Sequence, residues 1–189
     1  MFIDIQSWFI FLLILQTKPF MKYKKIIFAT IAVLFLNSAI AQSTLPAADV
    51  KALDGKTVNT SKFSNDGKPM IISFWATWCK PCKKELDAIA EVYAERQKET
   101  GVKLIAISTD DSRSSAKVAT DVKSKGWEYE VYQDENQDFK RAMNVGDIPH
   151  TFVLNGKGEI VWQHNGYADG DEDHLFEILK KVAKGEKVD

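Results

Sequence analysis

The sequence predicts one α/β domain in which helices flank a central mixed β-sheet. Two near-continuous apolar runs, 70–75 and 102–108, are typical of strands that are buried on both faces. An amphipathic stripe lies between them and predicts a helix, so the two strands should be parallel. Asp54-Gly55 and the segment 155–158 each separate short strand-like runs, which predicts hairpins with antiparallel pairs. A chain of 189 residues is long enough for one such domain and short for two.

The first half of the predicted domain alternates strands with helices. A hairpin should pair 50–53 with 56–59, and the helix after the first buried strand should end at Gly101. Apolar side chains at helical spacing mark its inward face: Leu86, Ile89, Ala90 and Tyr93. A second helix is expected over 113–125, closed by Gly126. Its inward residues should be Val118, Ala119 and Val122.

The residues after 126 complete the sheet and add a last helix. The alternation of Trp127, Tyr129 and Val131 predicts a third strand, near an edge of the sheet. A short helix is expected around 139–143. A hairpin should then pair 151–154 with 159–163. The final helix carries acids at its start and lysines at its end, which complements the helix dipole. Its apolar face consists of Leu175, Ile178, Leu179 and Val182.

The N-terminal region predicts export from the cytoplasm. Residues 21–41 combine a basic start, an apolar run over 26–36 and an Ala39-x-Ala41 end, which is the pattern of a secretory signal peptide cleaved before Gln42. The alternative is an uncleaved anchor that tethers the domain outside the membrane. Residues 1–20 are interpreted as an upstream extension before a second start at Met21. A first membrane segment is the competing interpretation, but its apolar stretch is short of the ~20 residues that a spanning helix needs.

The expected organisation is therefore a targeting region over 1–41, a flexible lead-in over 42–48 and a folded domain over 49–189. We expect the domain to reside in the periplasm, or to be membrane-anchored with the domain outside the cytoplasm. Beyond residue 41 the formal charge is −4, without a basic stripe, which argues against nucleic acid as the main partner.

The only two cysteines, Cys79 and Cys82, belong to a single Cys-x-x-Cys motif. A disulfide between residues so close in sequence cross-links almost no chain, so its value as a structural staple is small. A zinc site would need further ligands, and His150, His164 and His174 lack ligand-like spacing with the pair. The pair therefore indicates redox chemistry that needs neither a metal nor a cofactor.

The position of the pair, between a buried strand and the start of a helix, suits that chemistry. Backbone N–H groups and the positive end of the helix dipole favour a thiolate there, and Lys80 adds a nearby cation. Pro81 is compatible with the first helical turn, where no N–H partner is lost. Cysteines spaced i and i+3 can meet the Cα separation of a disulfide, roughly 4.4–6.8 Å.

Helical phase predicts different roles for the two sulfurs. Cys82 begins the apolar stripe of the helix and should be buried, whereas Cys79 lies outside the first turn and should be exposed. Cys79 is then the attacking sulfur, and Cys82 resolves the mixed disulfide. Glu85 lies on about the same face as Cys82 and is either the group that exchanges its proton or an ordinary acid of a first helical turn.

The segment 72–85, Ile-Ser-Phe-Trp-Ala-Thr-Trp-Cys-Lys-Pro-Cys-Lys-Lys-Glu, resembles the active-site segment of the TlpA/ResA-like branch of the thioredoxin superfamily. The Asp54-Gly55 hairpin and the segment 148–152 resemble that branch too, so the likeness covers about 49–183. It implies a thioredoxin-like fold with an extra N-terminal β-hairpin. It also implies thiol–disulfide exchange, with Glu85 as the branch's acidic residue after the pair.

The resemblance also implies a substrate-binding surface around the pair. Pro149 would be a cis-proline that faces the cysteines, although from sequence alone it could equally be a trans turn residue. Ile148 would offer backbone to an extended substrate, and Trp78, Lys80 and Pro81 would support it. Cytosolic-type thioredoxins have a buried Asp where this chain has Ser73, which leaves Glu85 as the acid–base group. His150 is a weak candidate for a further participant.

The predicted function is the reduction of disulfides in exported proteins, with apocytochrome c among the candidate substrates. Such a reductase needs electrons from a membrane-linked thiol partner, because the cell envelope is oxidising. A disulfide oxidase or isomerase is the nearest alternative, but Lys80-Pro81 does not match the Pro-His dipeptide familiar from strong envelope oxidases. A thiol peroxidase and a metallochaperone are more distant alternatives.

Overall fold

A computed structural model describes residues 44–188. The signal peptide predicted at 21–41 and the extension predicted at 1–20 lie outside these residues. Over the described range, no helix is long and apolar enough to cross a membrane. The described part of the expected lead-in is held against the domain: Thr44 bridges to Glu159, and the Thr60 hydroxyl donates to the carbonyl of Pro46 at 2.6 Å.

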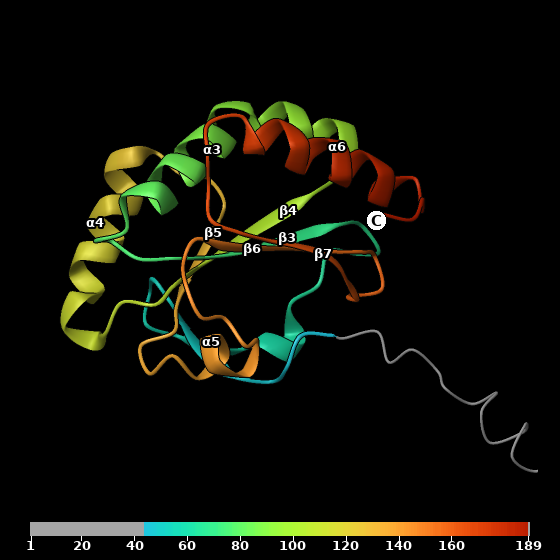
Figure 1. Ribbon diagram of the computed structural model, residues 1–189. Helices are drawn as coiled ribbons and strands as arrows, with labels where there is room; N and C mark the ends of the chain where they lie inside the picture. Colours follow the sequence, from blue (N-terminus) through green and yellow to red (C-terminus); the bar gives the residue numbers. More distant parts are fainter. Residues whose placement is uncertain (1–43, 189) are drawn as a thin grey trace, which may run out of the picture. The chain divides into compact units, whose positions relative to one another are not determined.

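Seven strands form one mixed sheet in the order β2-β1-β5-β4-β3-β6-β7, which confirms the predicted fold class (Figure 1). The three central strands β3, β4 and β5 are parallel, and all other neighbours pair antiparallel. The N-terminal hairpin turns at Gly55, whose φ of 85° favours glycine. The strands are β1 (Asp49–Ala52), β2 (Thr57–Asn59), β3 (Met70–Trp75), β4 (Lys103–Ser108), β5 (Glu130–Gln133), β6 (His150–Leu154) and β7 (Ile160–Asn165).

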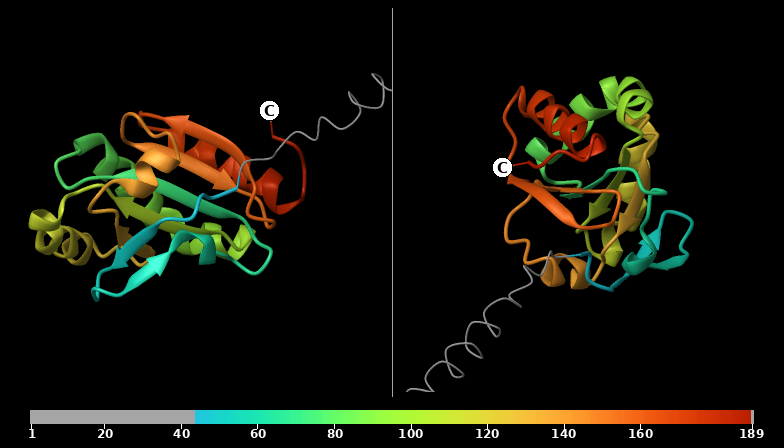
Figure 2. Two further views of the ribbon diagram at one scale, coloured as in Figure 1. Left: turned by 90° about the horizontal axis from the view of Figure 1, so that it is seen from below. Right: turned by 90° about the vertical axis from the view of Figure 1, so that its right-hand side faces the viewer.

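Helices cover both faces of the sheet. The apolar sides of α3 (Lys80–Thr100), α4 (Ser115–Lys125) and α6 (Asp171–Ala183) share one hydrophobic cluster, and α3 and α6 lie side by side on that face (Figures 1 and 2). The opposite face is covered by α5 (Asp138–Ala142) and the segment around the 3-10 turn η1 (Thr60–Lys62). A second 3-10 turn, η2 (Ser112–Ser114), leads into α4.

Strand β3 divides the core into two clusters. Ile71 and Trp75 point toward α3, whereas Met70, Ile72 and Phe74 point toward α5, and all six residues of the strand are buried. This confirms a central strand that is buried on both faces. Ser73 has the parity of Ile71 and Trp75, so its hydroxyl faces α3 inside an otherwise apolar layer.

The structure corrects three details of the predicted elements. Strand β5 is not near an edge, because β1 pairs with its free side and the N-terminal hairpin extends the sheet by two strands. Trp127 and Tyr129 are buried as expected but precede the strand. Ala119, expected to face inward on α4, is exposed, because only the i, i+4 pair Val118 and Val122 of this helix reaches the core.

Candidate active site

The redox pair lies at the junction between β3 and α3. Cys79 is the N-cap of α3, and its sulfur accepts a hydrogen bond from the backbone N–H of Cys82 at 3.3 Å. Pro81 lies in the first helical turn, as predicted. The two sulfurs form a disulfide with a Cα separation of 5.4 Å. In the reduced protein the same N–H would stabilise a thiolate on Cys79.

The two cysteines differ in burial less than predicted. Cys82 is fully buried, as expected, but Cys79 is only 5 % exposed and is therefore not an exposed side chain. The reason is a neighbouring loop: the Cys79 sulfur lies 3.8 Å from the carbonyl oxygen of Ile148. Helical phase predicted the order of accessibility correctly, but it could not anticipate a cover that comes from 69 residues further along the chain.

The covering loop contains Pro149, and its peptide bond with Ile148 is cis, the configuration that the family resemblance implied. Pro149 is buried and Ile148 is half-buried. The next residue begins β6, whose antiparallel pairing with β3 aligns His150 with Phe74. Strand pairing therefore brings the proline loop to the end of β3 from which the redox loop emerges.

Exposed side chains surround the pair on the solvent side. Trp78 precedes Cys79, and its large apolar side chain is 68 % exposed. Lys80 and Pro81 are exposed as well. The surface beside the Cys79 sulfur thus offers an apolar ring, a cation and the backbone of the proline loop.

Glu85 is buried behind the pair, one helical turn after Cys82. It is 5 % exposed, and two hydroxyl groups donate to its carboxylate: Thr151 to Oε1 at 2.7 Å and Ser73 to Oε2 at 3.2 Å. Burial raises the pKa of Glu85 to about 7, against the opposing effect of the two hydrogen bonds. A pKa near neutrality suits a group that must both accept and release a proton.

The Glu85 site can satisfy its hydrogen bonds in both protonation states. When the carboxyl is ionised, Ser73 and Thr151 each donate to one oxygen. When it is protonated, its O–H can donate to one of the two hydroxyls. That hydroxyl can then donate to the other, because the hydroxyl oxygens of Ser73 and Thr151 lie 3.2 Å apart. Neither state leaves a buried polar group unpaired, so proton exchange requires only rotation of two hydroxyls.

Two residues of the site were missed from sequence. Thr151 pairs directly with Ser73 across β6 and β3, and a hydroxyl within the apolar run 151–154 was the available signal. Asp110 is 3 % exposed and accepts from the backbone N–H of Thr77, the Thr77 hydroxyl and the Ser108 hydroxyl, each at 2.8 Å. Asp110 thereby ties the start of the redox loop to the end of β4.

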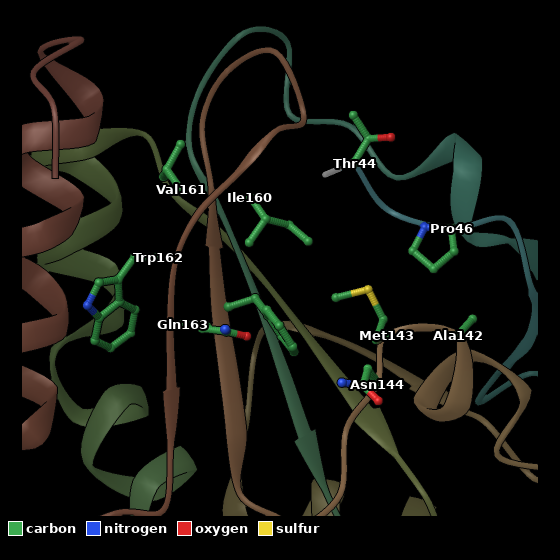
Figure 3. Close-up of a pocket in the computed structure, with 10 residues that line it drawn as sticks. Thr44, Pro46, Ala142, Met143, Asn144, Ile160, Val161, Trp162 and Gln163 are labelled. Atoms are coloured by element: carbon green, nitrogen blue, oxygen red, sulfur yellow. The ribbon is translucent and has the colours of Figure 1, made fainter. Parts of the chain in front are cut away.

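Other features of the described chain lie away from the pair. His150 points to the opposite face of the sheet from Glu85, where its ring stacks on Phe152 at 4.5 Å. A cavity of about 540 Å³ lies between β7, α5 and the N-terminal segment, and Figure 3 shows Ile160, Gln163 and Met143 around it. No titratable side chain lines it. Residues 44–188 contain no group of three or more His, Cys, Asp or Glu that could hold a metal ion.

Comparisons with known proteins identify a family for this chain. A model of the AhpC/TSA family matches residues 41–163. Thiol-disulfide oxidoreductase ResA from Bacillus cereus is 28% identical over 178 residues, which is 86% of this chain and 99% of that protein. The ResA of Bacillus thuringiensis subsp. konkukian is 31% identical over 133 residues, covering 70% of this chain and 73% of the relative.

Solved structures show the same fold. A thioredoxin-like protein from Porphyromonas gingivalis, solved in solution, is 54% identical with a TM-score of 0.68, covering 74% of this chain and 92% of that one. StoA from Bacillus subtilis is 25% identical with a TM-score of 0.55, and the match covers 70% of this chain and 97% of StoA. With the Cys79–Cys82 disulfide at the start of α3, the chain belongs to the AhpC/TSA family and is a ResA-like thiol–disulfide oxidoreductase.

Proposed function

We propose that this oxidoreductase works as a reductant of disulfides in exported proteins. The observation that carries the proposal is the carboxyl of Glu85, buried one turn behind Cys82. A negative charge in a buried site raises the pKa of neighbouring thiols and destabilises their thiolates. A strong oxidant owes its potential to a stabilised reduced form, so destabilising the thiolates favours the disulfide and makes the dithiol a better reductant.

The reductive half-cycle begins with the thiolate of Cys79. It attacks a sulfur of the substrate disulfide, forms a mixed disulfide and releases the first substrate thiolate, which takes a proton from solvent. Glu85 accepts the proton of the Cys82 thiol, and the Cys82 thiolate then attacks the sulfur of Cys79. The second substrate thiolate leaves, and the pair ends as the disulfide seen in the structure. Two electrons have passed to the substrate.

The surface beside Cys79 supports a protein substrate. An extended segment next to a substrate cystine can contact the exposed ring of Trp78 while its backbone meets that of Ile148. Lys80 and Pro81 are exposed on the same approach and complete this surface. Contacts of this kind are tolerant of sequence and suit an enzyme that acts on several partners.

The sequence pattern over 21–41 and the TlpA/ResA-like resemblance support the proposed location and partners. An exported domain works in an oxidising compartment, so the disulfide must be reduced again by a membrane-linked thiol partner. Apocytochrome c is a candidate substrate that the resemblance supports. If the signal remains uncleaved, the domain acts while tethered to the membrane.

The redox potential of the pair tests the direction of electron flow. We expect a value close to that of thioredoxin, about −270 mV, measured by equilibration with a glutathione or dithiothreitol couple. A value near −120 mV, typical of a strong oxidant, would refute the reductase proposal and favour the oxidase alternative.

A Cys82→Ser variant should trap substrates, because it cannot resolve the mixed disulfide on Cys79. We expect it to capture cystine-containing envelope proteins that are released by dithiothreitol. The matched control is Cys79→Ser, whose remaining sulfur is fully buried and should capture almost none. Equal capture by the two variants would contradict the assignment of roles.

A further inference from the structure

We propose that His164 and Asp171 form the outer half of a proton path that connects Glu85 with solvent. The inference rests on the proposed function in one respect: it takes Glu85 as the group that exchanges a proton with Cys82. It adds two positioning residues, one from β7 and one from α6. Both lie outside the Cys-x-x-Cys motif and far from it in the sequence.

Strand register places His164 beside the Glu85 site. His164 on β7 is the direct antiparallel partner of Thr151 on β6, and the Thr151 hydroxyl donates to Glu85 at 2.7 Å. Directly opposite residues of an antiparallel pair have Cβ atoms about 4.5–5.5 Å apart on the same face. The Thr151 hydroxyl itself bonds to Ser73 and Glu85, so a proton would cross from this hydroxyl to the imidazole through a bridging water.

The His164 ring is held in place on the face of the sheet that α6 covers. Its Nε2 lies 3.4 Å from Oδ2 of Asp171, at the first position of α6. The ring stacks on Trp162, with centroids 5.7 Å apart and planes at 13°, and Trp162 in turn contacts His174 of α6. The side chain of His164 is 42 % exposed, so its ring is in contact with water.

Asp171 also acts on Glu85 through space. Its negative charge raises the pKa of Glu85, in addition to the larger effect of burial. Tyr129 and Tyr167 face the same carboxyl, and burial raises the pKa of both phenols, so they stay neutral. Lys84, next to Glu85 on α3, is 3.7 Å from Asp169 in the loop before α6.

An imidazole–carboxylate pair suits proton release from Glu85. A neutral imidazole can accept a proton on one ring nitrogen and release one from the other. After Cys82 has given its proton to Glu85, the carboxyl passes a proton through the Thr151 hydroxyl and a bridging water to the His164 imidazole. The imidazolium then loses a proton to water. One proton leaves the site, no electron moves, and Glu85 is again a carboxylate.

The experiment has two measurements on the full chain. The first is the pKa of Glu85, from the pH titration of its side-chain carboxyl carbon by NMR in the oxidised protein. We expect Asp171→Asn to lower this pKa, because it removes a negative charge. The matched control is Asp173→Asn, which removes the same charge from the same first turn of α6 at an exposed position and should leave the pKa unchanged.

The second measurement is the rate at which Cys82 resolves a preformed mixed disulfide on Cys79, as a function of pH. We expect His164→Ala to slow resolution at least about 10-fold near neutral pH, and added imidazole to restore part of the rate. Rescue by a free base distinguishes proton transfer from a merely structural effect of the substitution.

The proposal is overturned if Asp171→Asn shifts the Glu85 pKa no more than Asp173→Asn does, or if His164→Ala resolves at the wild-type rate. It is supported by a lowered pKa together with slowed resolution that imidazole rescues. The NMR measurement is independent of the direction of electron flow. A failure of the reductase proposal would appear in the redox potential, and a failure of the proton path in these two measurements.

Discussion

Replacing Glu85 by Gln should change how the stability of the oxidised protein depends on pH. The carboxyl is 5 % exposed, and burial raises its pKa from 4.5 to about 7. Gln has nearly the shape of a protonated Glu, and the Thr151 and Ser73 hydroxyls can each turn to donate to it or accept from it. The substitution therefore keeps the neutral side chain and removes only the ionisation.

The magnitude follows from the two pKa values. Between pH 4.5 and 7 the unfolded chain releases the Glu85 proton while the folded protein retains it, so the free energy of unfolding falls as the pH rises. At 1.36 kcal/mol per pKa unit, the loss amounts to about 3 kcal/mol and is complete above pH 7. Glu85→Gln does not undergo this loss. It should match the wild type near pH 4 and exceed its stability by about 3 kcal/mol at pH 8.

The assay is urea denaturation of the oxidised proteins at several pH values, followed by fluorescence of the buried Trp75 and Trp127. The quantity of interest is the difference between variant and wild type, in which other titrating groups cancel. Glu95→Gln, an exposed position of the same helix, is the matched control and should give a difference that does not vary with pH. A pH-independent difference for Glu85→Gln as well would refute the reasoning from burial.

Two further predictions concern the hydrogen bonds around the site. Thr151→Val removes a hydrogen-bond donor to the Glu85 carboxylate and should raise the pKa of Glu85 in an NMR titration. Thr151→Ser keeps the donor and should leave that pKa at its wild-type value. An unchanged pKa in both variants would contradict this role of the hydrogen bond. Asp110→Asn replaces the carboxylate that accepts three hydrogen bonds from Thr77 and Ser108 by a neutral amide with a single accepting oxygen. It should lower the free energy of unfolding by about 1–3 kcal/mol in urea denaturation, and full wild-type stability would show that these bonds contribute nothing.

Local pattern was sufficient to predict most of the fold. The apolar run over 70–75 matches β3, the stripe from Leu86 to Tyr93 matches the buried side of α3, and glycine ends that helix at Gly101. These features depend on periods of two or 3.6 residues and on turn chemistry, which a short window of sequence contains. The full burial of Cys82 follows from the same helical phase.

Position within the sheet could not be predicted in this way. The alternation at 127–131 indicates a strand but does not say that β1 will pair with its open side. In the same way, nothing near Cys79 shows that the Ile148 loop will cover it. Both outcomes depend on contacts between segments that are far apart in the sequence.

Local residue pattern predicts that Cys79 and Cys82 are a redox pair at the start of a helix, and that Glu85 follows them on about the same face as Cys82. The pKa and the hydrogen-bond partners of Glu85, in contrast, depend on tertiary packing. A pKa of about 7 requires that the Glu85 carboxyl be buried. Its two hydrogen bonds require that Ser73 and Thr151, 78 residues apart, be direct partners across β3 and β6. A residue's solvation and its distant neighbours are set by how the chain packs, and no local period encodes them.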